Sequence, residues 1–192
     1  GVHIADVSHF VRSGGVLDLE ARERGNSVYL PDKVIPMLPE TLSNGICSLR
    51  PLEERLTLSA LLTFDRSGQV VERRFAKTMI RSSLRLTYEE AMSILKGQST
   101  PSLATLPGGR KSSGVRELLM GIHALAQELR AHRFAEHALD LDMPECEVMF
   151  DQNKAVSDVR LVWNDPSHQL IEECMVAANE AVASELESHG IR

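Results

Sequence analysis

Apolar residues recur at helical spacing in two long segments of the chain. In residues 115–134 they follow one another at intervals of three and four, which is typical of an amphipathic helix. A second long helix is predicted to run to about residue 188, because Asp165 is a good helix cap and Pro166 suits the first helical position. Shorter helices are predicted at 17–25 and at 87–97, the second with a capping box.

Strand patterns fill much of the rest of the chain. One hairpin is predicted around the turn sequence at 65–68 and a second one over 146–163. The chain opens with a strand-like stretch at 2–11, in which Val2 and Ile4 are expected to point inward. Hairpins and helices alternate without a strict βαβ rhythm. The predicted fold class is therefore α+β, with a mixed or antiparallel sheet and packed helices.

Two segments follow neither the helical nor the strand period. Residues 26–49 carry three prolines and a tyrosine, and irregular stretches of this length within a compact domain are uncommon and often functional. Residues 98–114 are rich in Ser, Thr, Gly and Pro, and they are predicted to form a mobile internal loop or linker. The first segment is therefore the better candidate for a functional role.

The composition restricts the class of protein. The 192 residues have room for one domain with a sizeable core or for two small ones. With 43% hydrophobic and 25% charged residues, the chain is typical of a soluble globular protein, and no apolar run approaches the length of a membrane span. The three cysteines are odd in number and far apart, which disfavours a disulfide scaffold and a cysteine zinc site. We therefore expect a reducing, cytoplasmic environment.

The net charge and the two ends of the chain add further limits. A formal charge of −6 provides no general attraction for nucleic acid, so a local site or neighbouring parts would have to supply it. Gly1 leads directly into a strand-like pattern, and the chain ends just after a helix stop at Gly190. We therefore expect the chain to be part of a longer protein.

The last predicted helix carries a stripe of polar side chains. At about 100° per residue, a set at offsets 0, 4, 7 and 11 falls within an arc of about 60°. Such a stripe could form hydrogen bonds with a ribose from the wall of a cleft, although similar residues are common on an exposed helix edge. The stripe consists of His168, Glu172, Met175 and Asn179, and the apolar set expected to face the core is Ile171, Cys174, Ala178 and Val182.

Tyr29 and Tyr88 are the two tyrosines of the chain. A tyrosine combines a ring that stacks with a hydroxyl that donates a hydrogen bond, which suits single-stranded nucleic acid. A tyrosine chosen at random more often packs against the core with its hydroxyl at the surface. The residue type therefore permits a nucleic-acid site at these positions without requiring one.

Metal and cofactor signals are weak. Asp6 follows a buried strand and could bind a metal, act as an acid or base, or cap a turn. His3 and His9 are too far apart along a strand for a zinc pair, and no third ligand is nearby. The sequence contains no Walker loop, no G-x-G-x-x-G and no G-x-S-x-G.

Several long stretches resemble one known family. The segments VHIADVSHFV, LDLEARERGNSVYLPDKVIPMLPETLSNGICSL and ERLTLSALLTF are similar to the catalytic (RNB) domain of the RNase II/RNase R exoribonucleases, which the catalytic subunit of the exosome shares. The likeness continues through RLTYEEAM, ALDLDMPE and HQLIEECMVAANEAVA, and the RNase R branch is the closer one. The resemblance covers nearly the whole chain apart from residues 98–114. It implies that residues 1–192 form part of an RNB domain.

The resemblance also implies roles for individual residues. Tyr29 matches a tyrosine that stacks on the 3′-terminal base at the deep end of an RNA channel, where prolines hold the loop rigid. Tyr88 matches a tyrosine implicated in distinguishing RNA from DNA, and Glu172, rather than Glu173, best matches the glutamate that acts with it. Leu141 aligns with a phenylalanine that stacks on a base in some members. Structural or supporting roles are expected for Asp6, His168 and Asn179.

The implied activity is removal of nucleotides from single-stranded RNA. The parent enzyme would hydrolyse RNA processively from the 3′ end to nucleoside 5′-monophosphates, with two Mg²⁺ ions. The metal-binding aspartates are expected upstream of residue 1 and a catalytic arginine downstream of the chain, so neither a metal ligand nor a catalytic residue is assigned within it. Flanking OB-type domains of the cold-shock and S1 kind would supply positive charge. The alternatives are a catalytically inactive RNA-binding or scaffold member of the family, and an unrelated α+β domain.

Overall fold

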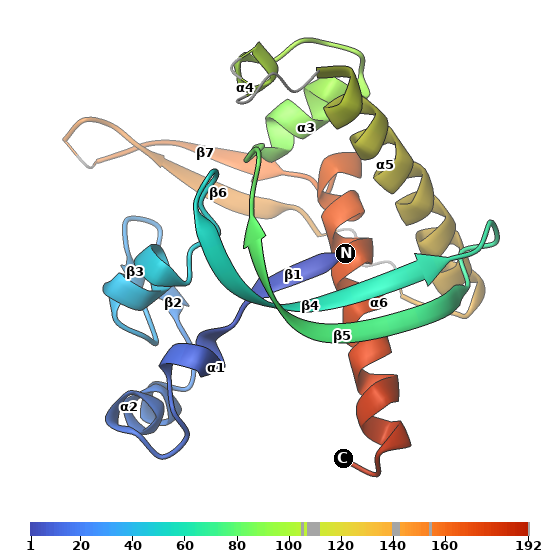
Figure 1. The fold of residues 1–192 in the computed structure, drawn as a ribbon. Coiled ribbons are helices and arrows are strands. Elements are labelled where there is room, and N and C mark those ends of the chain that lie inside the picture. Colours follow the sequence, from blue (N-terminus) through green and yellow to red (C-terminus); the bar gives the residue numbers. More distant parts are fainter. Residues whose placement is uncertain (105, 107–111, 140–142, 154, 192) are drawn as a thin grey trace.

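A computed structural model describes residues 1–104, 106, 112–139, 143–153 and 155–191 of the chain (Figure 1). In the described residues, two long helices, α5 and α6, pack together and α3 contacts both. The elements in chain order are β1 (Val2–Ala5), α1 (Val7–Phe10), α2 (Val16–Arg24), β2 (Val28–Tyr29), β3 (Val34–Ile35), the π-helix η1 (Thr41–Ile46), β4 (Glu54–Phe64), β5 (Val70–Arg81), α3 (Tyr88–Leu95), α4 (Pro101–Ala104), α5 (Ser112–Ala135), β6 (Glu145–Phe150), β7 (Val156–Val162) and α6 (Pro166–Ser188).

The main sheet is antiparallel, with the strand order β1-β4-β5. Its long β4–β5 hairpin closes with the predicted turn, in which the Asp65 carboxylate accepts hydrogen bonds from the backbone N–H groups of Ser67 and Gln69. Gly68 completes the turn with a φ of 79°, a conformation that favours glycine. Figure 1 shows α6 passing close to this sheet and α5 lying beside α6. The predicted α+β class with an antiparallel sheet and packed helices is thereby confirmed.

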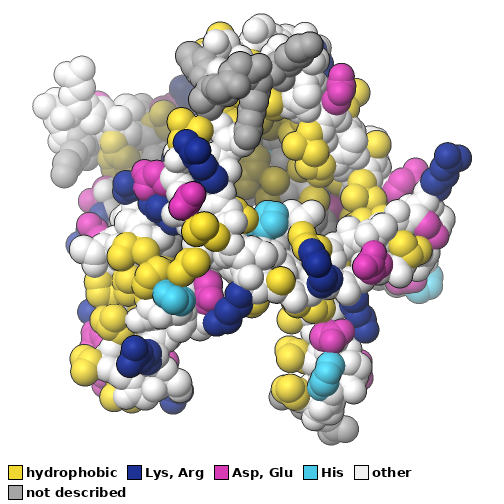
Figure 2. Space-filling model, in the orientation of Figure 1, with side chains coloured by type: hydrophobic (Ala, Val, Ile, Leu, Met, Phe, Trp, Pro, Cys, Tyr) yellow, Lys and Arg dark blue, Asp and Glu magenta, His cyan; other side chains and the backbone are white. Residues whose placement is uncertain are grey.

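The first strand is shorter than predicted. It ends at Ala5, after which the backbone N–H of Asp6 donates to the carbonyl of Leu56 and the chain turns into α1. The inward orientation predicted for Ile4 was wrong. Ile4 pairs with Leu58, and these two side chains are 60% and 51% exposed on an open face of the sheet. Figure 2 shows hydrophobic side chains spread over the face of the molecule that it draws.

The buried face of α6 differs from the predicted one. Ile171 and Val182 are exposed at 43% and 39%, so half of the apolar set expected in the core faces outward. The helix instead buries Glu173, which two arginines of α5 neutralise, together with small side chains that allow close packing. The buried residues of α6 are Ser167, Leu170, Glu173, Ala177, Ala178 and Ala181.

The two aperiodic segments contain more regular structure than the sequence indicated. The stretch 26–49 includes the short β2–β3 pair, in which Tyr29 lies opposite Val34, and then η1. In the predicted linker, α4 forms a short helix and α5 already begins at Ser112, so the segment is not a linker throughout. Residues 105 and 107–111 lie outside the described residues, and the prediction of mobility is untested. Among the described helices, none is both long and apolar enough to span a bilayer.

The cap of α6 carries a testable contribution to stability. The Asp165 carboxylate accepts hydrogen bonds from the N–H groups of Ser167 and His168, as predicted for an N-cap. Replacing Asp165 by alanine is expected to lower the free energy of unfolding by about 1 kcal/mol, which urea titration of this chain would measure.

The pH dependence of this loss has a defined sign. Desolvation alone would raise the pKa of Asp165, but hydrogen bonds from Ser167 and His168 lower it to about 2. A depressed pKa stabilises the folded state above the ordinary value of 3.8, and this contribution disappears as the pH falls through about 2. Asp165→Asn, which keeps a capping oxygen without the charge, is the control: it should keep part of the stability, and that part should not change over the pH range in which Asp165 titrates. A difference in stability between the alanine variant and the wild type that is as large at pH 2 as at neutral pH would contradict this account.

Candidate functional site

A cavity of about 540 Å³ lies where the first turn of α3, the end of β7 and one face of α6 meet. It unites residues from distant parts of the sequence. The whole predicted polar stripe of α6 lines it, which confirms that these four side chains share one face. The lining residues are Tyr88, Arg130, Met143, Val162, Trp163, Asn164, His168, Gln169, Ile171, Glu172, Met175, Val176 and Asn179.

Two stacked rings form one wall of this cavity. The rings of Tyr88 and His168 are 3.9 Å apart between centroids and 18° from parallel. Tyr88 is the first residue of α3, where the capping box of Thr87 and Glu90 fixes the start of the helix. The Asp165 carboxylate holds the other ring, with its Oδ1 2.8 Å from Nδ1 of His168. A helix cap therefore holds the His168 ring directly, while the Tyr88 ring stacks on it and remains 47% exposed.

The carboxylate of Glu172 forms another part of the lining. Its Oε1 accepts a hydrogen bond from a terminal guanidinium nitrogen of Arg133 at 3.3 Å, and its Oε2 accepts one from the amide nitrogen of Asn164 at 3.0 Å. The two partners belong to α5 and to the connection before α6. Glu172 is thus held from two sides while its side chain is still 39% exposed.

The neighbouring Glu173 has a different environment. Its side chain is 2% exposed and lies against α5, where it pairs with Arg133 and with Arg130 at 3.4 Å. Arg133 contacts both oxygens of Glu173, and this hydrogen bonding raises the pKa of the arginine while burial opposes the rise. The structure therefore places Glu172, and not Glu173, in the cavity of Tyr88.

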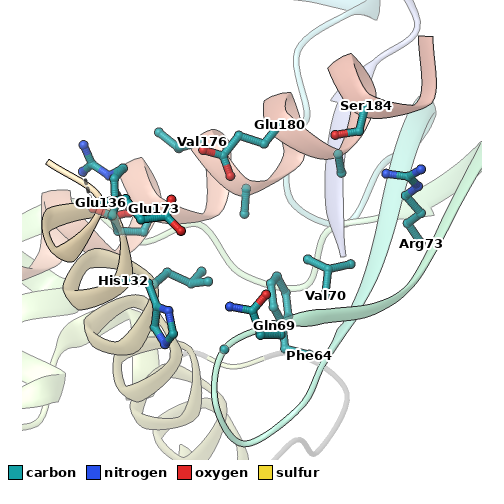
Figure 3. A pocket seen from close by; sticks show the side chains of 15 residues that line it. Phe64, Gln69, Val70, Arg73, His132, Glu136, Glu173, Val176, Glu180 and Ser184 are labelled. Atoms are coloured by element: carbon teal, nitrogen blue, oxygen red, sulfur yellow. Dashed lines mark hydrogen bonds and ion pairs between the residues drawn. The ribbon is translucent and has the colours of Figure 1, made fainter. Parts of the chain in front are cut away.

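A second cavity of about 300 Å³ lies between the β4–β5 turn and helices α5 and α6 (Figure 3). Side chains of both charges line it, including Arg73, His132, Glu136 and Glu180, and Glu173 reaches it from α6. Among the described residues, none of the site residues predicted from the sequence lines this cavity. The first cavity is therefore the one that combines the predicted residues.

Tyr29 lies apart from this group. It sits in β2 with 78% of its surface exposed, and it does not line the cavity of Tyr88 and Glu172. Its predicted stacking on the 3′-terminal base stays a prediction. Leu141 lies outside the described residues, so nothing is added to its predicted base contact.

Asp6 is buried and fully engaged. Its carboxylate accepts a hydrogen bond from the hydroxyl of Ser8 and pairs with Lys77 at 3.3 Å. The Ser8 hydroxyl lowers the pKa of Asp6, desolvation opposes this, and Lys77 lowers it further. These contacts tie the end of β1 to β5.

In the part of the chain that the structure describes, no group of three or more His, Cys, Asp or Glu side chains could hold a metal ion. The predicted Mg²⁺ ions therefore have no fitting site among the described residues.

The sequence profile of the RNB domain matches residues 1–192. The chain belongs to the RNB domain family. It is 41% identical over 192 residues to Ribonuclease R of Thermotoga maritima, covering 100% of this chain and 26% of that protein. The RNB chain thus spans about a quarter of the length of this relative. The predicted family resemblance is confirmed.

Solved structures agree with this family. Mycoplasma genitalium RNase R, in a complex with double-stranded RNA, matches 98% of this RNB chain and 32% of its own, with a TM-score of 0.88 and 30% identity. The structure of yeast Ssd1, described as a pseudonuclease, matches 97% of this chain and 21% of its own with a TM-score of 0.68. At 22% identity, this second likeness concerns the fold alone.

Proposed function

We propose that this RNB chain is part of a 3′-to-5′ exoribonuclease that degrades single-stranded RNA processively to nucleoside 5′-monophosphates. The observation that carries the proposal is the cavity in which Tyr88, His168 and Glu172 meet in a chain of this family. A stacked pair of rings and a carboxylate with two hydrogen-bond partners, lining one cavity, suit a ribose and its base. We also propose that the protein acts in the cytoplasm and that OB-type domains flank this chain.

In this proposal, the cavity reads the ribose of the RNA. The 2′-hydroxyl is the group that separates RNA from DNA at a given nucleotide, and it can donate a hydrogen bond. An ionised carboxylate such as Glu172 only accepts, so it would favour a sugar that carries this donor. The exposed face of the Tyr88 ring would pack against the same nucleotide. Met175 and Asn179, which line the same cavity, would contact the RNA strand next to it.

Tyr29 and Leu141 complete the proposed path of the RNA strand. The exposed ring of Tyr29 would stack on the 3′-terminal base, since every base offers a π-face. Leu141 would add an apolar base contact without aromatic stacking. The Mg²⁺ ions and the catalytic arginine of the proposed reaction are assigned to parts of the protein outside these 192 residues.

One experiment compares the full-length protein with this chain. Both are incubated with Mg²⁺ and single-stranded RNA, one sample labelled at its 5′ end and another labelled throughout, and products are resolved by length. The full-length protein is expected to shorten the RNA stepwise from the 3′ end and release nucleoside 5′-monophosphates. This chain alone is expected to leave the RNA intact, even with excess Mg²⁺ or Mn²⁺, because the metal ligands lie elsewhere.

Each departure from this result has a clear meaning. If the full-length protein binds RNA without shortening it, the catalytic proposal fails and the inactive RNA-binding or scaffold role replaces it. The fold of yeast Ssd1, a pseudonuclease, is compatible with that second role. Shortening of RNA by the 192-residue chain itself would contradict the assignment of the metal ligands to other parts.

A further inference from the structure

We propose that Arg133 and Asn164 are positioning residues that orient the Glu172 carboxylate toward the ribose 2′-hydroxyl. The inference rests on the proposed function, because it assigns supports to the group that would read the sugar. Each support holds a different oxygen of Glu172, Arg133 at 3.3 Å and Asn164 at 3.0 Å. A carboxylate held at both oxygens cannot rotate freely about its last bond.

The number of contacts leaves room for a ligand. An ionised carboxylate offers about four lone-pair sites to hydrogen-bond donors. The two contacts from Arg133 and Asn164 occupy two of these sites, and the 39% exposure of the Glu172 side chain leaves part of it open to the cavity. A sugar hydroxyl can therefore be accepted without displacing either support.

The support from Arg133 is itself fixed. Two of its nitrogens donate to the buried carboxylate of Glu173, at 3.3 Å for Nε and through a short contact for the terminal nitrogen. The planar guanidinium fork suits such two-point contacts, which a lysine could not reproduce. Glu173 thus anchors Arg133 on α5, and Arg133 in turn reaches Glu172 at the edge of the cavity.

Fixing Glu172 before the ligand arrives has an energetic reason. A free glutamate side chain loses rotamer freedom when it binds a ligand, and this loss of entropy opposes binding. A carboxylate already held by Arg133 and Asn164 has lost this freedom on folding. The hydrogen bond to a 2′-hydroxyl then contributes more fully to the choice between ribose and deoxyribose.

The test uses the full-length protein and two single-stranded oligonucleotides. One is RNA, and the other has the same bases with 2′-deoxy sugars at its 3′ end. The readout is the ratio of kcat/KM for the two substrates. Asn164→Ala and Arg133→Met are each expected to lower this ratio about tenfold, mainly by slowing the RNA substrate, since each removes a hydrogen bond to a charged group.

Further variants show that the effect passes through Glu172. Glu172→Ala should also lower the ratio, and combining it with Asn164→Ala should give no further loss. Arg73→Met is the matched control, because Arg73 forms an ion pair with α6 at Glu185 outside this cavity. If Arg133→Met fails to fold, Asn164→Ala still tests the inference. Asn164 is exposed and does not contact the ion pair of Arg133 and Glu173, so its replacement should not disturb folding.

The outcomes separate this inference from the proposed function. If the wild-type protein does not degrade RNA, the proposed function fails, and the inference falls with it. If the wild type prefers RNA and Glu172→Ala removes the preference, unchanged ratios for Asn164→Ala and Arg133→Met overturn the inference alone. If Glu172→Ala keeps the preference, Glu172 does not read the ribose, and its supports have no such role.

Discussion

Replacing Glu173 by alanine is expected to destabilise the chain by about 3 kcal/mol, because it removes a buried carboxylate that pairs with two partly buried arginines of α5. The Glu173 side chain is 2% exposed and pairs with Arg130 and Arg133, whose side chains are 21% and 26% exposed. Its removal also loosens the contact between α5 and α6. The midpoint of urea unfolding, followed by circular dichroism, would report the loss.

The adjacent Glu172 provides a matched control for this prediction. It has the same side chain one residue earlier, but it is 39% exposed, so Glu172→Ala should cost at most about 1 kcal/mol. The comparison separates burial of the charge from the mere loss of a glutamate on α6. Equal losses for Glu172→Ala and Glu173→Ala would show that the buried network does not stabilise the helix pair.

Replacing Tyr29 by alanine is expected to lower kcat/KM of the full-length protein on single-stranded RNA by about 10- to 100-fold. The reason is that stacking of one base on an aromatic ring is worth about 1–3 kcal/mol. Because Tyr29 is 78% exposed and lies in a two-residue strand, folding should change little. Steady-state kinetics on a labelled RNA oligonucleotide and a thermal unfolding curve measure both quantities.

Tyr29→Phe is the control that isolates the ring. It keeps the stacking surface and removes only the hydroxyl, so most of the activity should remain. If alanine and phenylalanine at position 29 both behave as the wild type, the exposed ring lies off the path of the RNA. If phenylalanine is as damaging as alanine, the hydroxyl and not the ring carries the contact.

Local patterns predicted the longer helices and hairpins of this fold, although they missed the short elements. The 3.6-residue period found α5 and α6, the capping residues Thr87 and Asp165 marked two helix starts, and the turn at 65–68 fixed the β4–β5 hairpin. The same helical period placed the four cavity residues of α6 on one face. Each of these features depends on residues that are close together in the chain, so the pattern that produces it can be read from the sequence.

Contacts between distant segments were not predictable in this way. Arg133 meets Glu172 across 39 residues of chain, and nothing in the spacing of either helix shows which faces will meet. For the same reason the core side of α6 was misjudged: Ile171 looked more suitable for burial than Glu173, because the arginines that neutralise Glu173 lie on another helix. One local feature of the sequence could have indicated the contact between Asn164 and Glu172. Asn164 stands immediately before the cap Asp165, from where its short side chain can reach the first turns of α6.

Positions 172 and 173 should tolerate substitution very differently, although they are consecutive and carry the same amino acid. At position 173 only an acidic residue balances the charge of the arginines of α5. Variants with other residues there should therefore misfold and show no activity. At 172 many replacements should still yield a folded protein whose choice of nucleic acid has changed. In a library randomised at both codons, the folded variants should therefore retain glutamate at position 173. Among these folded variants, different residues at position 172 should give a graded series of nucleic-acid preferences.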